Sequence, residues 1–196
     1  ETISIVFDLD QIAYRIFKGH KIRLSISNSY WPLLWPTPDK SEIEIVEGSI
    51  EIPVINGSIE NTRNFLPEKT DEPWKTETLR EASNSRKITR DIGSDGSILE
   101  IIDDFGLVRD LKHDLEIGSI AREWWSIHPD DPLSAEGKTH WTEERSRGAW
   151  KTRTETYAKM NSDAENFYIY AKLEAYENEI LFFEKEISET ISRDSH

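Results

Sequence analysis

Few residues of this chain have types and spacing suited to catalysis. The nearest approach to the G-x-S-x-G elbow of a serine nucleophile is the stretch Gly93-Ser-Asp-Gly-Ser97. Its order departs from the elbow, and Gly93, Asp95 and Gly96 suit the positive φ angles of a hairpin turn. We therefore interpret this stretch as a turn, and the sequence predicts no catalytic residue.

Metal-binding residue types are present, but without metal-binding spacing. The histidines form no H-E-x-x-H motif and no i, i+4 pair, which argues against zinc; those inside the chain are His20, His113, His128 and His140. Asp130 and Asp131 offer oxygens to calcium, but no glycine-centred ligand loop surrounds them, and a proline-flanked turn fits better. We expect no metal and no other cofactor.

An aromatic loop is the more open candidate for a binding site. Tyr30, Trp31 and Trp35 lie beside three prolines in the segment SYWPLLWPTP. Large rings are costly to leave in water, so they either contact a ligand or a neighbouring domain, or fold back over their own sheet. Both uses remain open, and these three residues are our candidate ligand or domain-interface site.

Composition restricts the partners. The 196 residues carry a formal net charge of -14, with the acids spread along the chain, so nucleic acid and membrane surfaces are not expected partners. Cysteine is absent, which gives no indication of an oxidising compartment. We find no run of about 18 apolar residues and no signal peptide, and expect a cytoplasmic protein. Because the chain opens on Glu1 and enters a strand pattern directly, we expect it to be part of a longer one.

Hydrophobic alternation predicts strands along most of the chain. In the first part we expect strands over 2–9 and 21–28, a helical turn over 11–17, and further strands around Ile43 and from Ile50 to Val54. In the second part we expect strands over 87–91, 97–103, 107–110, 115–127, 138–145, 150–160, 166–177 and 180–191. A helix competes over 166–177, but its aromatic alternation favours a strand.

These elements predict an all-β fold. Regular antiparallel strands with polar turns are typical of a sandwich or barrel. We expect jelly-roll-like sandwich strands in residues 1–55, a linker with short ordered pieces over 56–87, and a second antiparallel β-domain over 88–196. That second domain is predicted to be a sandwich or a lipocalin-like barrel that holds an apolar ligand.

The segment LDQIAYRIFKGHKIRLSISNSYWPLLWPTPD resembles the C-terminal, non-catalytic β-domain of the CocE/NonD family of α/β-hydrolases, which includes X-Pro dipeptidyl-peptidases and cocaine esterase. The resemblance is strongest over 8–39. It extends more weakly over 90–194, through HPDDPLSAEGKTHW, SRGAWKTRTET and FYIYAKLEAYE. It implies that a Ser-His-Asp triad lies upstream, so no catalytic residue is carried over to this chain.

The resemblance also implies a function and a partner. The chain would be the accessory region of a serine hydrolase acting on ester or X-Pro amide bonds, and would stabilise the catalytic domain, shape its site or mediate assembly. Its partner would be the upstream α/β-hydrolase domain of the same polypeptide. Strands left unpaired in 1–55 would pair with the second half or across a homodimer. The alternative is an autonomous carbohydrate- or ligand-binding β-sandwich that uses Trp31, Trp35 and Trp124 as stacking platforms.

Overall fold

The computed structural model describes residues 2–39, 42–55, 57 and 65–193. Within these residues every regular element is a β-strand, which confirms the all-β class. The strands are β1 (Thr76–Arg80), β2 (Ser83–Arg90), β3 (Ser97–Asp110), β4 (Leu115–His128), β5 (Asp131–Arg147), β6 (Trp150–Ser162), β7 (Asn166–Glu177) and β8 (Ile180–Ser192).

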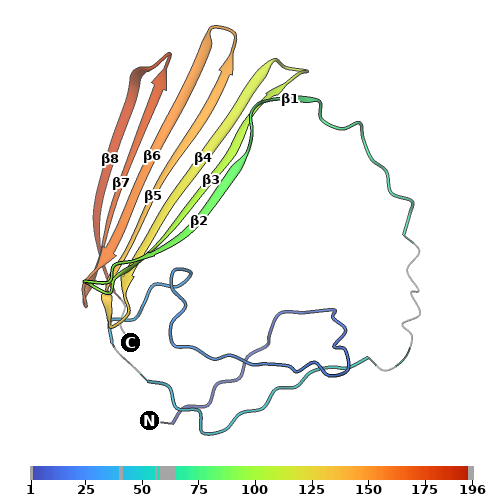
Figure 1. The fold of residues 1–196 in the computed structure, drawn as a ribbon, viewed down its shortest axis with the longest axis vertical. Coiled ribbons are helices and arrows are strands. Elements are labelled where there is room, and N and C mark those ends of the chain that lie inside the picture. Colours follow the sequence, from blue (N-terminus) through green and yellow to red (C-terminus); the bar gives the residue numbers. More distant parts are fainter. Residues whose placement is uncertain (1, 40–41, 56, 58–64, 194–196) are drawn as a thin grey trace.

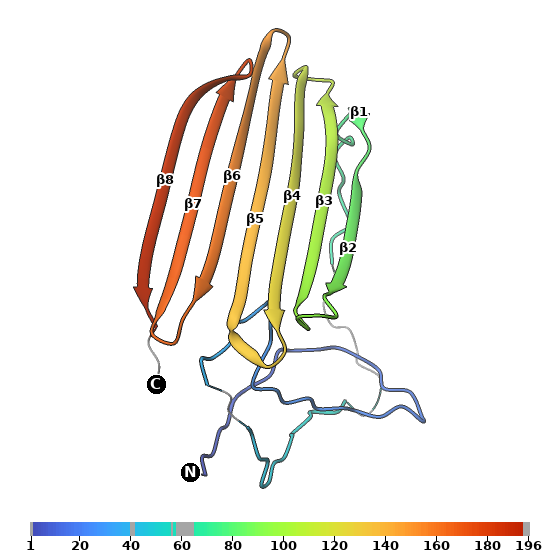
Figure 2. The ribbon, with the colours of Figure 1, turned by 60° about the vertical axis from the view of Figure 1, so that its left-hand side comes forward.

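All eight strands belong to one antiparallel sheet, shown side by side in Figures 1 and 2. The order is β1-β3-β4-β5-β6-β7-β8, and β2 also pairs with β3. The sheet therefore ends at β8 on one side and at the β1 and β2 side on the other. The lipocalin-like barrel is not confirmed, because these two edges do not pair within the described part of the chain.

Short hairpin turns explain why each strand pairs with the next. Asn178 and Glu179 both have positive φ, 49° and 64°, between β7 and β8. Two central residues with positive φ match the twist of antiparallel strands, and asparagine tolerates this conformation well. Gly148 supplies a positive φ of 59° between β5 and β6. The strands expected over 166–177 and 180–191 are confirmed, with β8 ending one residue later.

The edge beside β3 is divided by a bulge. β1 pairs with β3 up to Leu107, β2 pairs with it from Asp104, and Phe105 and Gly106 lie between the two ladders. Gly106 has φ of +84°, and its N–H donates to Asp104 Oδ1 at 2.8 Å. The two strands expected over 97–103 and 107–110 are thus one long strand, β3, with a bulge inside it.

The two faces of the sheet differ in chemistry. Directly opposed residues share a face, so the register assigns each side chain. One face, called here the apolar face, carries most of the large hydrophobic side chains, among them Leu99, Ile101, Ile117, Trp125, Trp141, Met160, Phe167, Ile169, Leu173, Phe183, Ile187 and Ile191. The other, called the polar face, carries most of the ion pairs, including those that Lys172 makes with Glu174 and Glu184.

No enclosed core lies on either face among the described residues. The buried hydrophobic residues there are Ala121 and Ala135, at 3% and 1% exposure. Side chains of the apolar face such as Phe183 remain 46% exposed. A sheet of this kind normally packs its apolar face against another layer, as in a sandwich.

Residues 2–75 contain no strand in their described part, although four were expected. The alternation is present in the sequence, but a strand also needs a partner for its N–H and C=O groups. The described residues before Lys75 form no ladder with one another or with the sheet, and the Lys75 carbonyl accepts the Leu111 N–H next to the first β1–β3 pair. The helical turn over 11–17 is also absent, whereas the turn at Gly19 forms, with His20 N donating to Phe17 O. β1 and the start of β2 lie inside the range 56–87, where residues 56 and 58–64 are outside the described part.

Candidate functional site

The Trp/Pro loop, residues 30–38, docks on one end of the apolar face. Trp31 packs edge to face on Trp35, with ring centroids 5.0 Å apart, and on Trp125 of β4 at 5.7 Å. Trp35 makes a similar contact with Phe167 of β7 at 6.2 Å. Edge-to-face packing places the positive ring edge against a negative ring face. These four rings, called here the aromatic anchor, join the loop to two strands far away in sequence.

Hydrogen bonds with Ser162 and Arg193 hold the anchor and its loop in place. Trp35 Nε1 donates to Ser162 Oγ at 2.9 Å, and Ser162 is largely buried at the end of β6. Arg193 Nη1 donates to the same hydroxyl at 2.9 Å, and its Nη2 donates to Pro36 O at 2.6 Å. The guanidinium also lies 4.7 Å from the Phe167 ring centroid, a cation–π contact. Arg193 therefore joins the loop, β6 and β7 through one side chain.

Gly137 on β5 makes room for the anchor. It lies directly opposite Trp125, on the same face of the sheet. A Cβ at Gly137 would lie 2.6 Å from the Trp125 ring, closer than carbon atoms approach without displacement. The indole therefore lies across a position where no other residue type would fit without a shift.

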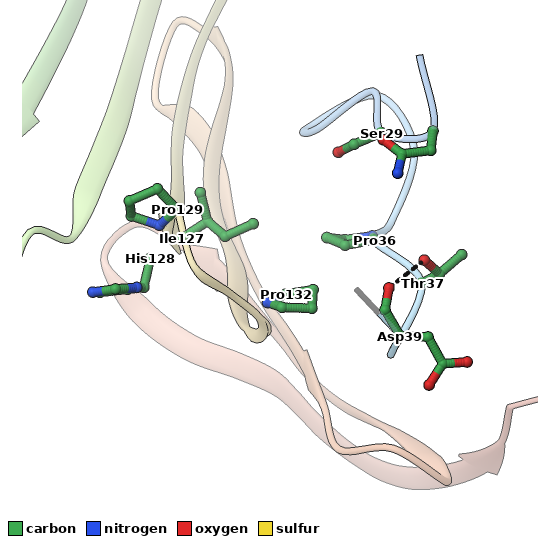
Figure 3. A pocket seen from close by; sticks show the side chains of 9 residues that line it. Ser29, Pro36, Thr37, Asp39, Ile127, His128, Pro129 and Pro132 are labelled. Carbon is green, nitrogen blue, oxygen red and sulfur yellow. Dashed lines mark hydrogen bonds between the residues drawn. The ribbon is translucent and has the colours of Figure 1, made fainter. Parts of the chain in front are cut away.

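A shallow cavity of about 180 Å³ lies beside the anchor, between the Trp/Pro loop and the β4–β5 hairpin (Figure 3). Its lining residues are Asn28, Ser29, Pro36, Thr37, Asp39, Ile127, His128, Pro129 and Pro132. His128 Nδ1 accepts the Asp130 N–H at 3.2 Å, so the ring is engaged in its own turn. The proline-flanked turn expected for HPDDP forms here, with Pro129 and Asp130 between β4 and β5.

The three candidate residues have different environments. Trp31 and Trp35 are half-buried in the anchor, whereas the Tyr30 side chain is 63% exposed and its carbonyl accepts the Leu34 N–H. The tryptophan of the anchor on β4 is Trp125. Its neighbour Trp124 points to the polar face and donates to Glu100 Oε2 at 3.0 Å.

The polar face holds the most closely packed titratable cluster. Glu155 Oε2 accepts hydrogen bonds from Thr142 Oγ1 at 2.7 Å and contacts His140 Nε2 at 2.7 Å, while Arg153 pairs with Glu155 Oε1. Burial raises the pKa of Glu155, but these hydrogen bonds outweigh burial and lower the pKa below its usual value. The ring of Tyr157 stacks on His140 with centroids 4.3 Å apart. The charged and polar groups of this cluster are therefore engaged with one another.

The remaining candidates from the sequence, the metal-binding residue types and the Gly93-to-Ser97 stretch, form no metal site and no nucleophile elbow among the described residues. In the described part of the chain no three His, Asp or Glu side chains are placed to hold a metal ion. The Gly93-to-Ser97 stretch is the β2–β3 turn, in which Asp91 Oδ1 accepts the N–H groups of Gly93 and Ser94. In the part of the chain that the structure describes, no helix is long and apolar enough to cross a bilayer.

Comparison with known proteins finds a family match for the first part of the chain. Residues 1–77 match the family model described as the X-Pro dipeptidyl-peptidase C-terminal non-catalytic domain. The first part of the chain is therefore similar to the non-catalytic C-terminal domain of a CocE/NonD-like hydrolase, as its sequence predicted. The match ends close to the start of β1, so the resemblance expected over 90–194 stays a prediction. No curated protein and no solved structure matches the chain.

The sequence alone predicts two of the four rings of the aromatic anchor as site residues. Ring size and a proline-rich loop identify Trp31 and Trp35 from the sequence. The sequence gives no comparable signal for Ser162 or Arg193, whereas Phe167 belongs to the aromatic alternation of β7.

Proposed function

We propose that this chain is an accessory region of a serine hydrolase that acts on ester or X-Pro amide bonds. Its role is to support the catalytic domain of the same polypeptide, and it has no catalytic centre of its own. The match of residues 1–77 to a non-catalytic C-terminal domain carries this proposal. A cytoplasmic location, expected from the sequence, stays a prediction.

The aromatic anchor supports a mechanical role for the Trp/Pro loop. This loop lies inside the matched segment, and its contacts with Trp125, Phe167 and Arg193 belong to the sheet and its C-terminal end. The anchor therefore fastens the family-like segment to β4–β8. In this proposal Trp31 and Trp35 serve as interface residues within the chain, and the exposed Tyr30 is left to contact the catalytic domain.

The exposed surface supports a large partner. A compact monomer of 22.8 kDa exposes about 9,600 Å² of surface. This chain exposes 16974 Å², and the excess includes the apolar face and residues 2–55. Burial against a catalytic domain would remove such surface from water, which stabilises both partners.

The carbohydrate-binding alternative receives less support. A stacking platform needs a free ring face, but the rings of Trp31 and Trp35 contact one another and two further aromatic rings. Trp124 lies on the opposite face of the sheet and is bonded to Glu100. The three rings proposed as a sugar platform therefore do not share one surface.

Labelling with a fluorophosphonate probe tests the proposal. The probe reacts with activated serines, so we expect it to label the product of the complete reading frame that contains this chain. We expect no labelling of the 196-residue chain. Specific labelling of a serine in the 196-residue chain, or of neither protein, would overturn the accessory role.

A variant in the long protein tests the support role separately. Trp31→Ala removes a ring that contacts both Trp35 and Trp125. We expect a lower melting temperature of the catalytic domain with unchanged chemistry at its serine. Leu33→Ala, at a neighbouring position that is 69% exposed, is the matched control. Equal melting temperatures for the two variants and the parent would argue against support through the anchor.

A further inference from the structure

β8 is an edge strand of 13 residues, all of them exposed, which pairs with β7 on one side and with no strand of the described residues on the other. Edge strands present rows of free N–H and C=O groups, which natural proteins usually protect with charge or breaks. The opposite edge is protected in this way, because it is interrupted between β1 and β2 and carries Arg86 and Lys87. β8 also carries charges, at Glu184, Lys185, Glu186 and Glu189. From Phe183 onward, however, its ladder with β7 has no break, and it carries Phe183, Ile187 and Ile191 on the apolar face.

The register shows which backbone groups of β8 point outward. Arg193 N donates to Glu165 O, and these residues continue the β7–β8 ladder past the Asn166–Ser192 pair. In an antiparallel ladder the hydrogen-bonded positions alternate. From Phe183 onward, past the register shift near the start of the strand, the odd-numbered residues of β8 therefore direct their N–H and C=O groups to β7. Those of Glu184, Glu186, Ser188 and Thr190 point away from the sheet.

The side chains of β8 form a self-complementary pattern about Ile187. If a second β8 runs antiparallel with Ile187 opposite Ile187, Lys185 lies opposite Glu189 and Phe183 lies opposite Ile191. These pairs are on the apolar face and fall at non-hydrogen-bonded positions, where side chains approach most closely. On the polar face Glu186 lies opposite Ser188 and Glu184 opposite Thr190. The outward N–H and C=O groups then form about eight hydrogen bonds across the junction.

Neighbouring registers lack this complementarity. Centring the pair on Lys185 or Glu186 places like charges directly opposite, which is destabilising. Centring it on Ser188 places Ile187 opposite Glu189 and Lys185 opposite Ile191. The Ile187 register is thus favoured by both its charges and its apolar pairs. Neither Lys185 nor Glu189 makes an ion pair within the described residues, so both charges are available for this contact.

We propose that β8 is a homodimerisation edge, at which two copies of this chain join through antiparallel β8 strands with a two-fold axis at Ile187. The occupant is a second copy because both halves of the contact are supplied by one sequence. A two-fold contact closes on itself, whereas pairing of β8 with the β2 edge of another copy would continue into a filament. The proposal concerns this chain alone and does not depend on a hydrolase parent.

The dimer and its register can be tested in the intact 196-residue chain by reversing the charges at positions 185 and 189. For the unsubstituted chain, sedimentation velocity across a concentration series is expected to show a monomer–dimer equilibrium. Lys185→Glu and Glu189→Lys each create a like-charge pair, and each is expected to raise the dimer dissociation constant about tenfold or more. The double variant Lys185→Glu/Glu189→Lys restores opposite charges and is expected to return within about threefold of the parent. Recovery in the double variant also shows that the single variants fold.

Disulfide cross-linking tests the axis. The chain has no cysteine, so Ile187→Cys introduces a single thiol at the expected axis. Non-hydrogen-bonded antiparallel pairs have Cα atoms at a distance that a disulfide can span. Mild oxidation is expected to give a covalent dimer. Ile88→Cys, on the same face of the β2 edge and 78% exposed, is the matched control and is expected to remain monomeric in a denaturing gel.

Each other outcome would overturn the proposal. A parent chain that is monomeric at every concentration has no such edge contact. Species larger than a dimer would indicate head-to-tail pairing of β8 with β2. Single charge variants that dimerise as tightly as the parent, or equal cross-linking at positions 187 and 88, would rule out this register.

Discussion

At the scale of single residues, the structure depends on small side chains that let large ones approach. Gly137 is placed where the ring of Trp125 crosses β5, and Ser162 gives one hydroxyl to two donors, Trp35 and Arg193. Neither residue is large enough to contribute much apolar area itself. Each one determines where a larger neighbour lies, which makes both sensitive to substitution.

Gly137→Ala is expected to destabilise the chain by about 1–3 kcal/mol, because its Cβ would displace the Trp125 ring and disturb the ring contact with Trp31. Urea unfolding followed by tryptophan fluorescence measures the change. Gly48→Ala is the matched control, since nothing lies within 4 Å of its added Cβ. Equal midpoints for both variants would show that the ring has room to shift.

Asp110 provides a pH-dependent test. The hydrogen bond with His113 is the largest effect on this carboxyl, and with the Lys112 N–H it lowers the Asp110 pKa from 3.8 to about 2. Since the folded pKa lies below the unfolded one, the carboxylate stabilises the fold above about pH 4, and this contribution is lost as pH falls toward 2. Carbon NMR titration of the carboxyl is expected to give a higher pKa in His113→Ala. An unchanged pKa would mean that His113 does not control it.

At the scale of elements, the bulge at Phe105 and Gly106 lets one long strand carry two partners on the same edge. Arg80 lies at this junction, where it bonds Asp104 at 3.0 Å and Glu144 at 3.1 Å. The Arg80 guanidinium thus joins β1, β3 and β5 at the bulge. The bulge itself depends on the positive φ of Gly106.

Gly106→Ala is expected to cost about 1–3 kcal/mol, because alanine is strained at φ of +84° and its Cβ would lie 2.7 Å from Arg80 O. Gly148→Ala separates the two causes, since its φ is +59° but nothing lies within 4 Å. We expect the smaller loss there, of about 1–2 kcal/mol. Thermal unfolding by circular dichroism measures both, and a smaller loss for Gly106→Ala would contradict the role of the contact.

The strands were predictable where local signals were sufficient. β7 occupies the predicted range Asn166–Glu177, because its alternation is strong and Asn178 suits the turn that follows. The same alternation in Thr2 to Leu9 produced no strand. Pairing there would need partners from elsewhere, and one sequence does not reveal whether a partner is available.

At the scale of the whole molecule, the candidate site could be predicted in part. Ring type and prolines identified Trp31 and Trp35, but Trp35 meets Ser162 across 127 positions of sequence, and Arg193 meets Pro36 across 157. Such contacts depend on the register of the sheet. A shift of one residue would exchange Trp125 for Trp124 on the apolar face, so the sequence alone does not show which of the two shares a face with the Trp/Pro loop.

Limited proteolysis tests the relation between the two parts of the molecule. Among the described residues, backbone hydrogen bonding is regular only from Thr76 onward, so the first tryptic cuts are expected before β1, at sites such as Lys21 and Arg23. The resistant product should begin near β1, as identified by mass spectrometry. Initial cuts inside β3–β8 would contradict this order of stability.

The anchor should set the rate of those cuts. Arg193→Gln removes the bond to the Pro36 carbonyl, and Trp35→Ala removes the contacts with Ser162 and Phe167. A loss of about 1–2 kcal/mol in holding the loop corresponds to cleavage about 5 to 30 times faster, with the same resistant product. Leu34→Ala, at a side chain 63% exposed, should leave the rate unchanged. Faster cleavage in the first two variants alone would show that the anchor holds the family-like segment on the sheet, whereas equal rates in all three would place that restraint elsewhere.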